Sequence, residues 1–303
     1  MIPHFPEFKK LTIDDRKSIE EITRGFEPFS DYNFVSLFCW DTKEEVEISR
    51  FYDNLIVLFV DYINGERFYS FIGLTHVDET IDKLIDQAKK EGMREKLGLI
   101  PEPVIENIKE SKKYIIEEDR DGFDYILSVS DLVELKGSKY HPKKNFINRY
   151  KKAYEDVTHV KELTLSDKET KENVLKLFYE WEKSRGKDRK ETENELNAIK
   201  KLLEHSHLLD LKTIGLFINN ELKGFAINEL ISDEHGIAHF EKVDVSHVGI
   251  FQYLKHQTAL MFHEQGTKFM NIEQDLGIES LRKAKESLYP VKFLKKYTVR
   301  LKQ

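Results

Sequence analysis

The stretch KTIGLFINNELKGFAINELIS, Lys212–Ser232, consists of two apolar runs separated by Asn219-Asn220. Asparagine tolerates the left-handed backbone of tight turns, and the β-branched and aromatic residues on both sides suit strands. The stretch therefore predicts an antiparallel hairpin. A further apolar run, GIAHFEKVDV at Gly236–Val245, predicts a third strand after it.

The segments around this hairpin alternate between helical and extended patterns. Apolar residues at helical spacing predict two helices before it, with stripes at Val174, Leu177, Phe178 and Trp181 and at Leu196, Ile199, Leu202 and Leu203. A third helix begins at Gly249. A short basic helix, Glu279–Leu288, then lies between strands at Lys268–Gln274 and Val291–Leu301. This order favours a mixed sheet with helices on both faces.

The first half of the chain follows the same plan. Its central stretch, Asn54–Leu74, predicts a hairpin turning at Asn64-Gly65. The next stretch predicts a helix with the buried stripe Ile81, Leu84, Ile85 and Ala88. We therefore expect an α/β (α+β) fold built twice, with an N-terminal domain at 1–135, a basic bridging segment at 136–155 and a C-terminal domain at 156–303.

Composition limits the classes of function. The 303 residues are 34% charged with a net charge of −7, so no DNA partner is expected. The single cysteine, Cys39, suits a reducing compartment. The N-terminal residues lack a signal layout, and the longest aliphatic run, Leu55–Val60, is far shorter than a membrane span. We expect a cytoplasmic protein without an integral membrane segment.

The bridging segment is basic within an acidic protein. Lys136–Lys152 contains seven Lys and Arg residues and no acidic one. Such side chains contact phosphates without reading sequence, so Lys143, Lys144 and Arg149 are candidates for RNA binding. A solvated interdomain helix beginning near Pro142 explains the same pattern.

The junction after the third strand is a candidate phosphate site. A helix N-terminus presents free N–H groups and the positive end of a dipole, which suits a phosphate. The residues at this junction are Ser246, His247, Val248, Gly249 and Ile250. An ordinary connection in which Ser246 caps the helix fits equally.

Two carboxylates follow the strand at Lys268–Gln274. Alternation places Asn271 and Glu273 on one face, expected to be wet, and Glu273 and Asp275 come at its C-terminal end, where α/β sheets bind ligands. The next helix is expected to bury Leu281, Ala284 and Leu288. This leaves Arg282 and Lys285 for solvent or a ligand.

Glu241 lies inside an apolar strand, where a carboxylate is costly to bury unless it is paired. It is either a general base with a raised pKa or a surface residue beside Lys242. The histidines form no HExxH motif and no Cys/His cluster, so no metal is expected. GxSxG, Walker A and GxGxxG motifs are also absent from the sequence.

Two stretches carry a family resemblance: LKGSKYHPKKNFINRYKK at Leu135–Lys152 and, more specifically, EQDLGIESLRKAKESLYPVKFLKKY at Glu273–Tyr297. They resemble the C-terminal domain of the phosphatidylglycerol lysyltransferase family (DUF2156), which is similar to two tandem GNAT (N-acetyltransferase) folds. The resemblance implies transfer of an acyl or aminoacyl group from acyl-CoA or aminoacyl-tRNA to an amine or hydroxyl acceptor. The expected partner is a small acyl donor or a tRNA acceptor end.

The resemblance also implies roles for the candidate residues. Glu241 or Glu273 would deprotonate the acceptor, and Tyr289 would reprotonate the leaving group. Substrate would be held by Asp275, Arg282 and Lys285. The junction at 246–250 corresponds to the coenzyme A loop of GNAT enzymes but lacks that loop's leading Gln or Arg and its last small residue. The alternative is a non-catalytic module that binds a ligand or RNA.

Overall fold

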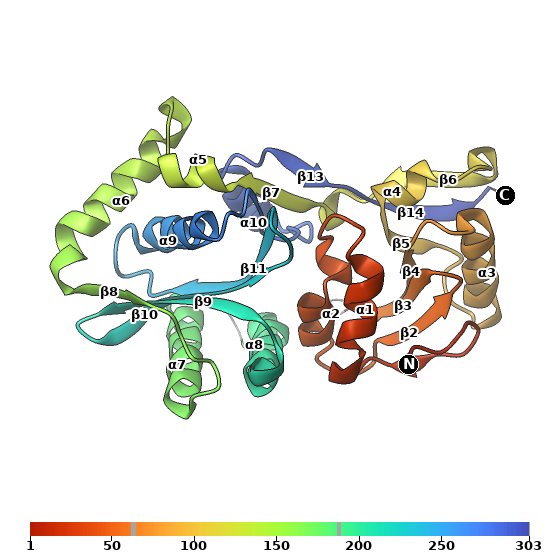
Figure 1. Ribbon diagram of the computed structural model, residues 1–303, viewed down its shortest axis with the longest axis horizontal. Coiled ribbons are helices and arrows are strands. Elements are labelled where there is room, and N and C mark those ends of the chain that lie inside the picture. The colour runs from red at the N-terminus through yellow and green to blue at the C-terminus, as the bar shows by residue number, and fades with distance from the viewer. Residues whose placement is uncertain (62–64, 187–188, 303) are drawn as a thin grey trace. The chain divides into compact units, whose positions relative to one another are not determined.

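The computed structural model describes residues 1–61, 65–186 and 189–302, and the chain forms two compact units (Figure 1). The first unit contains residues 1–125, 274–287 and 292–303. The second contains residues 126–273 and 288–291. Both units are discontinuous in sequence, whereas the boundaries expected from the sequence divide the chain into continuous segments.

The first unit begins with an antiparallel sheet whose strands lie side by side in the order in which they occur in the chain. Its strands are β1 (Lys9–Lys10), β2 (Glu47–Phe51), β3 (Asn54–Val60) and β4 (Arg67–Ile72). Strands β3 and β4 pair from Leu55 opposite Ile72 to Val60 opposite Arg67, which confirms the predicted hairpin. Asn64 of its turn lies outside the described residues.

A second sheet of the first unit has the last strand of the chain at its centre. Strand β14 (Lys296–Leu301) lies between β5 (Leu97–Pro101) and β6 (Tyr114–Glu118) and is antiparallel to both. Val299 of β14 joins one apolar core with residues of β3, β4 and α3 (Val77–Lys90). The predicted stripe of α3 is buried in that core, as expected.

The remaining elements of the first unit are short. The helices α1 (Arg16–Thr23) and α2 (Phe34–Trp40) lie across the first sheet from α3 (Figure 1). The other elements are η1 (Ile13–Asp15), η2 (Ser30–Tyr32), α4 (Glu102–Glu106), η3 (Ser111–Lys113), η4 (Arg120–Gly122), α10 (Glu279–Glu286) and β13 (Lys292–Leu294).

The second unit is a sheet with helices on both faces. Its strand order is β7 (Asp124–Ser128), β12 (Phe269–Asn271), β11 (His235–Val243), β10 (Glu221–Leu230), β9 (Leu211–Ile218) and β8 (Thr158–Lys161). β7 contributes only its last three residues, Ile126–Ser128, to this unit. In the strand order, the other neighbour of β7 is β13. β11 and β12 run parallel, and every other pair from β7 to β8 is antiparallel.

One face of this sheet is covered by α9 (Ile250–Glu264), with α5 (Val129–Glu134) and α6 (His141–Tyr154) beyond it (Figure 1). The other face carries α7 (Lys168–Ser184) and α8 (Arg189–His205). Short 3-10 turns complete the unit: η5 (Ser138–Tyr140), η6 (Glu155–Val157) and η7 (Ser206–Leu208). The predicted mixed α/β fold with mostly antiparallel sheets is confirmed.

Two local predictions were wrong. Asn271, expected on a wet face, is 1% exposed, because both faces of the short strand β12 are covered. Of the stripe expected on the helix at Glu279–Leu288, Leu288 is buried as predicted, but Ala284 is exposed and Leu281 is only half-buried. An ion pair of Arg282 with Asp275 and a hydrogen bond from Lys285 to the Gln274 carbonyl oxygen attach this helix instead.

Candidate active site

The parallel strands of the second unit part at their C-terminal ends. The paired register of β11 and β12 ends at Ile237 opposite Asn271, although β11 continues to Val243. Just beyond that point, Ile227 of β10 pairs with Phe240 and the next residue of β10 pairs with Ala238. His239 is therefore the extra residue of a β-bulge, a feature that re-aims side chains and is common beside active sites.

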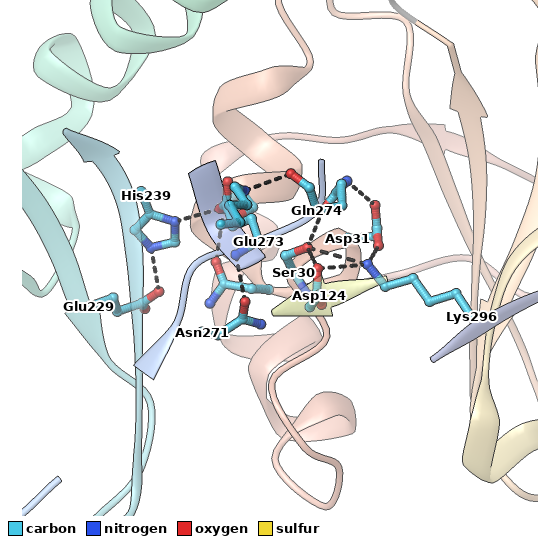
Figure 2. Close-up of polar contacts among 12 residues, drawn as sticks. Ser30, Asp31, Asp124, Glu229, His239, Asn271, Glu273, Gln274 and Lys296 are labelled. Carbon is cyan, nitrogen blue, oxygen red and sulfur yellow. Dashed lines mark hydrogen bonds and ion pairs between the residues drawn. The ribbon is translucent and has the colours of Figure 1, made fainter. Parts of the chain in front are cut away.

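His239 lies between two carboxylates (Figure 2). Its Nε2 is 3.3 Å from Glu229 Oε2, and its Nδ1 is 3.2 Å from Glu273 Oε1. The His239 side chain is 1% exposed, that of Glu229 6% and that of Glu273 15%. The three residues come from β10, β11 and the segment after β12, so the fold brings together groups that are distant in sequence.

The two carboxylates keep His239 charged. Burial lowers the pKa of the imidazole, but the hydrogen bonds to Glu229 and Glu273 outweigh this effect and raise the pKa of His239 to about 9. The imidazolium therefore donates from both ring nitrogens at neutral pH.

Glu273 has a constrained backbone. Its φ is +59°, a left-handed value that non-glycine residues adopt at a cost. The backbone N–H of Glu273 donates to Oδ1 of the buried Asn271 at 2.7 Å, which holds the turn. Constraints on both backbone and side chain fix where this carboxylate points.

Glu241, the other predicted base, is committed to an ion pair. Its Oε2 contacts the Nζ of Lys255, a buried residue of α9. Its Oε1 is buried and has no hydrogen-bond partner among the described residues. Glu241 thus faces α9, whereas Glu273 is linked to the bulge through His239. The role of either carboxylate as a base stays a prediction.

The junction before α9 is closely packed. Ser246 donates from its N–H and its hydroxyl to Asp244 Oδ1. Gly249 has φ +86°, and a Cβ there would lie 2.2 Å from the carbonyl oxygen of Phe146 in α6. The glycine is therefore required by the contact between α6 and α9. The predicted binding of a donor phosphate at residues 246–250 stays a prediction.

Asp275 of the first unit is completely buried and fully engaged. Arg282 binds it through Nε at 2.9 Å and a terminal nitrogen at 2.8 Å, and Arg120 reaches it at 3.2 Å. The Tyr125 hydroxyl and the Gly277 N–H also donate to it. Burial raises the pKa of Asp275, but these donors outweigh burial and lower it to about 2.

These contacts bear on three residues predicted to bind substrate. Asp275 and Arg282 are bound to each other, and Lys285 donates from Nζ to the Gln274 carbonyl oxygen at 2.6 Å. In this arrangement they stabilise the turn that leads into α10. Their role in substrate binding stays a prediction.

A second buried group in the first unit contains Lys296 (Figure 2). Its Nζ contacts Asp31, lies 2.9 Å from Asp124 and lies 3.4 Å from the Ser30 hydroxyl. Burial lowers the pKa of Lys296, but the two carboxylates outweigh burial and raise it. A Lys held as a cation is not a base for Ser30, so these residues tie β14 to η2 and β7.

Three residues of the basic segment pack against Tyr289, which is 37% exposed. The Nζ atoms of Lys139 and Lys143 lie 5.4 and 5.7 Å from the centre of its ring, and the Tyr140 ring packs edge-on against it at 5.3 Å. Burial lowers the pKa of Lys143. Lys144 and Arg149, farther along α6, are exposed.

Sequence reasoning missed His239, Glu229 and Lys296. Glu229 and His239 are titratable residues inside largely apolar strands, which was the available signal for them, whereas Lys296 is the first residue of β14, KYTVRL, and follows another lysine. Within residues 1–61, 65–186 and 189–302, no group of His, Cys, Asp and Glu side chains is arranged to hold a metal ion. None of the helices described there is both long and apolar enough to cross a bilayer.

Comparison with solved structures finds similar folds along the whole chain. A conserved protein of unknown function from Bacteroides thetaiotaomicron VPI-5482 is 31% identical, with a TM-score of 0.86 and full coverage of both chains. The structure of L-PGS from Bacillus licheniformis is 14% identical, with a TM-score of 0.65 over 97% of this chain and 93% of that one. FemX is 8% identical, with a TM-score of 0.58 over 98% and 97%.

A comparison with curated protein sequences found no significant match. The family model described as "Phosphatidylglycerol lysyltransferase, C-terminal" matches residues 24–300, which cover the whole second unit and most of the first. The protein belongs to this family.

Proposed function

We propose that the protein is an acyl- or aminoacyl-transferase whose reaction takes place at the C-terminal ends of β11 and β12. The observation that carries the proposal is the constrained Glu273 carboxylate at the point where these strands part. Ligands of α/β sheets bind at such strand ends. Membership of the lysyltransferase family and the likeness to the L-PGS and FemX folds support this class of reaction.

The transfer needs one base and one acid. Glu273 accepts the proton of an amine or hydroxyl acceptor as the acceptor's lone pair attacks the carbonyl carbon of the donor. The bond to the leaving group, a thiol of coenzyme A or a ribose hydroxyl of tRNA, then breaks. The leaving group takes back one proton, from Tyr289 or through water, so that protons balance over the cycle. Glu241 is the second candidate base.

The donor is acyl-CoA or aminoacyl-tRNA. Both carry phosphates, and Lys139 and Lys143, whose Nζ atoms lie within 6 Å of the centre of the Tyr289 ring, supply positive charge in the second unit. The N–H groups at the start of α9, residues 246–250, are a further place for a phosphate. No metal ion takes part in this proposal.

The first experiment follows donor consumption. The full chain is incubated with radiolabelled acetyl-CoA or with bulk tRNA charged with radiolabelled amino acids, and ethanolamine and glycerol serve as amine and hydroxyl acceptors. The expected result is enzyme-dependent loss of label from one donor. Calorimetry with coenzyme A and filter binding with uncharged tRNA measure binding separately.

The outcomes separate the two classes of function. Consumption that depends on Glu273 supports the transferase. Binding of one donor without any consumption identifies the alternative, a non-catalytic module that has kept the fold. If neither donor binds nor is consumed at high protein concentration, both proposals fail.

RNA binding through α6 is the second candidate function. Lys144, Arg149 and Lys152 are exposed along a helix that lies in a segment without acidic residues. Changing all three to Glu should abolish salt-sensitive retention of tRNA. The same change at Lys168, Lys171 and Lys176 of α7 is the control and should weaken retention much less. Absence of retention by the unmodified protein at low salt would exclude this function.

A further inference from the structure

We propose that His239 is a positioning residue that orients Glu273 for proton transfer, and that Glu229 supports it from behind. The inference rests on the proposed transferase function and selects Glu273 over Glu241 as the base. It assigns no substrate contact to His239 itself, because its side chain is buried.

The bulge is the first step of the argument. A regular strand sends successive side chains to opposite faces, so a register without the bulge would change the face of every residue on one side of it. Because His239 is the extra residue, it can face Glu229 on β10 while Glu241 and Val243 remain directed at α9. The irregularity of β11 therefore has a specific consequence, which is the contact of His239 with both carboxylates.

The second step is the geometry of the three side chains. The imidazole has two N–H groups at fixed directions, and each meets one carboxylate oxygen. Glu229 is the more buried carboxylate and holds the ring, while Glu273 is the more exposed one and receives the other N–H. This is the arrangement in which one acid orients a histidine and the histidine orients a second group.

The third step is the position of Glu273. It follows the last paired residue of β12 by two positions, and its left-handed backbone is held by Asn271. A side chain confined through both backbone and carboxylate loses little entropy when it binds a reacting group. Glu241 offers no such arrangement, because the only one of its carboxylate oxygens with a partner among the described residues is paired with the buried Lys255.

The first test does not require activity. Ring-nitrogen NMR of isotope-labelled histidine, assigned with His239→Gln, should show an imidazolium with both N–H groups hydrogen-bonded at neutral pH. Glu273→Gln should shift the Nδ1 resonance, and Glu229→Gln should shift the Nε2 resonance. Among the residues that the structure describes, the charged groups that contact the ring nitrogens are Glu229 on β10 and Glu273 after β12. A neutral ring, or resonances that neither change moves, would overturn the inference.

The second test separates positioning from folding. With the donor that the protein consumes, His239→Gln and Glu229→Gln should lower kcat by about 10-fold or more while KM for the donor stays within about twofold. Glu195→Gln is the matched control. Glu195, on α8, pairs at 2.5 Å with Lys242 of β11, the strand that carries His239. In the described structure it contacts none of Glu229, His239 and Glu273. It should leave kcat unchanged. Circular dichroism checks that each variant is folded.

Failure of the inference differs from failure of the proposed function. If wild-type protein consumes a donor and folded His239→Gln retains kcat, the positioning role is wrong and the transferase stands. If no donor is consumed, the transferase fails and the role of His239 fails with it, whatever the NMR shows. If His239→Gln does not fold, Glu229→Gln decides the kinetic question.

Discussion

Asp275 illustrates how a single residue holds a local structure. It is fully buried, it binds Arg282 through two nitrogens, and it also accepts from Tyr125. Asp275→Asn should cost about 2–3 kcal/mol of unfolding free energy, because it weakens the charge-assisted hydrogen bonds that Arg282 and Arg120 make to a buried carboxylate, while both arginines stay about one-third exposed. Urea unfolding followed by circular dichroism measures the difference.

Glu279→Gln is the control for this change. Glu279 pairs with Lys283 on the same helix, but both side chains are more than 70% exposed, so its loss should cost less than about 1 kcal/mol. Equal costs for the two variants would contradict the structural role of Asp275.

Since the pKa of Asp275 is lowered from 3.8 to about 2, its contribution to the free energy of unfolding should persist above pH 4 and disappear as the pH falls towards 2.

His239 should produce the opposite dependence on pH. Its pKa rises from 6.5 to about 9 on folding, so its ion pairs stabilise the native state fully below pH 6.5. That contribution, at most about 3 kcal/mol, should be lost as the pH rises from 6.5 to 9. In urea unfolding at several pH values, the wild-type protein should weaken over this range more than His239→Gln does. Parallel curves for the two proteins would contradict the ion pairing.

The helix pair α6 and α9 permits a test at the scale of elements. Gly249→Ala would place a Cβ against the Phe146 carbonyl at 2.2 Å in addition to its positive φ. Gly266 has a similar φ, +82°, but no atom lies within 4 Å of a Cβ there. Gly266→Ala should cost about 1–2 kcal/mol for backbone strain alone.

The steric contact should add about 1–3 kcal/mol to the cost of Gly249→Ala. Unfolding free energies of the two variants, measured side by side, isolate this term. If the two variants lose the same unfolding free energy, α6 moves away from the new Cβ without cost. The close approach of α6 and α9 would then not require a glycine at position 249.

Elements with a strong local period were predictable from the sequence. The hairpins at β3–β4 and β9–β10 and the stripe of α3 follow from alternation, turn residues and 3.6-residue spacing. The bulge at His239 has no such signal, because it is a shift of register between two strands. The contacts of His239 with Glu229 and Glu273 depend on that shift, so the central group of the candidate site could not be read from the chain.

The path of the chain through the two units was equally hidden from sequence reasoning. A continuous pattern of helices and strands suggests continuous domains, yet β14 completes a sheet of the first unit at the end of the chain. Pairing of strands about two hundred residues apart leaves no periodic trace. Lys296, buried between Asp31 and Asp124, helps to hold this strand in place, together with its pairing to β5 and β6.

Removal of residues 292–303 should therefore disrupt the first unit. Strands β5 and β6 would lose their shared neighbour, and Asp31 and Asp124 would lose the cation between them. Hydrogen exchange should show lost protection at Leu97–Pro101 and Tyr114–Glu118, and Lys296→Met should show a weaker form of the same effect. Removal of Lys302 and Gln303 alone is the control. Native protection of β5 and β6 in the chain that lacks residues 292–303 would contradict this role of β14.

Whether Glu273 is the base is tested by the turnover of Glu273→Gln relative to that of Glu195→Gln, measured with the donor that the wild-type protein consumes. Both variants replace a carboxylate of the second unit by its amide, and only the first removes the base. We expect Glu273→Gln to lower kcat by about 100-fold or more and Glu195→Gln to retain the wild-type kcat. Equal turnover by the two folded variants would contradict a reaction centred on Glu273.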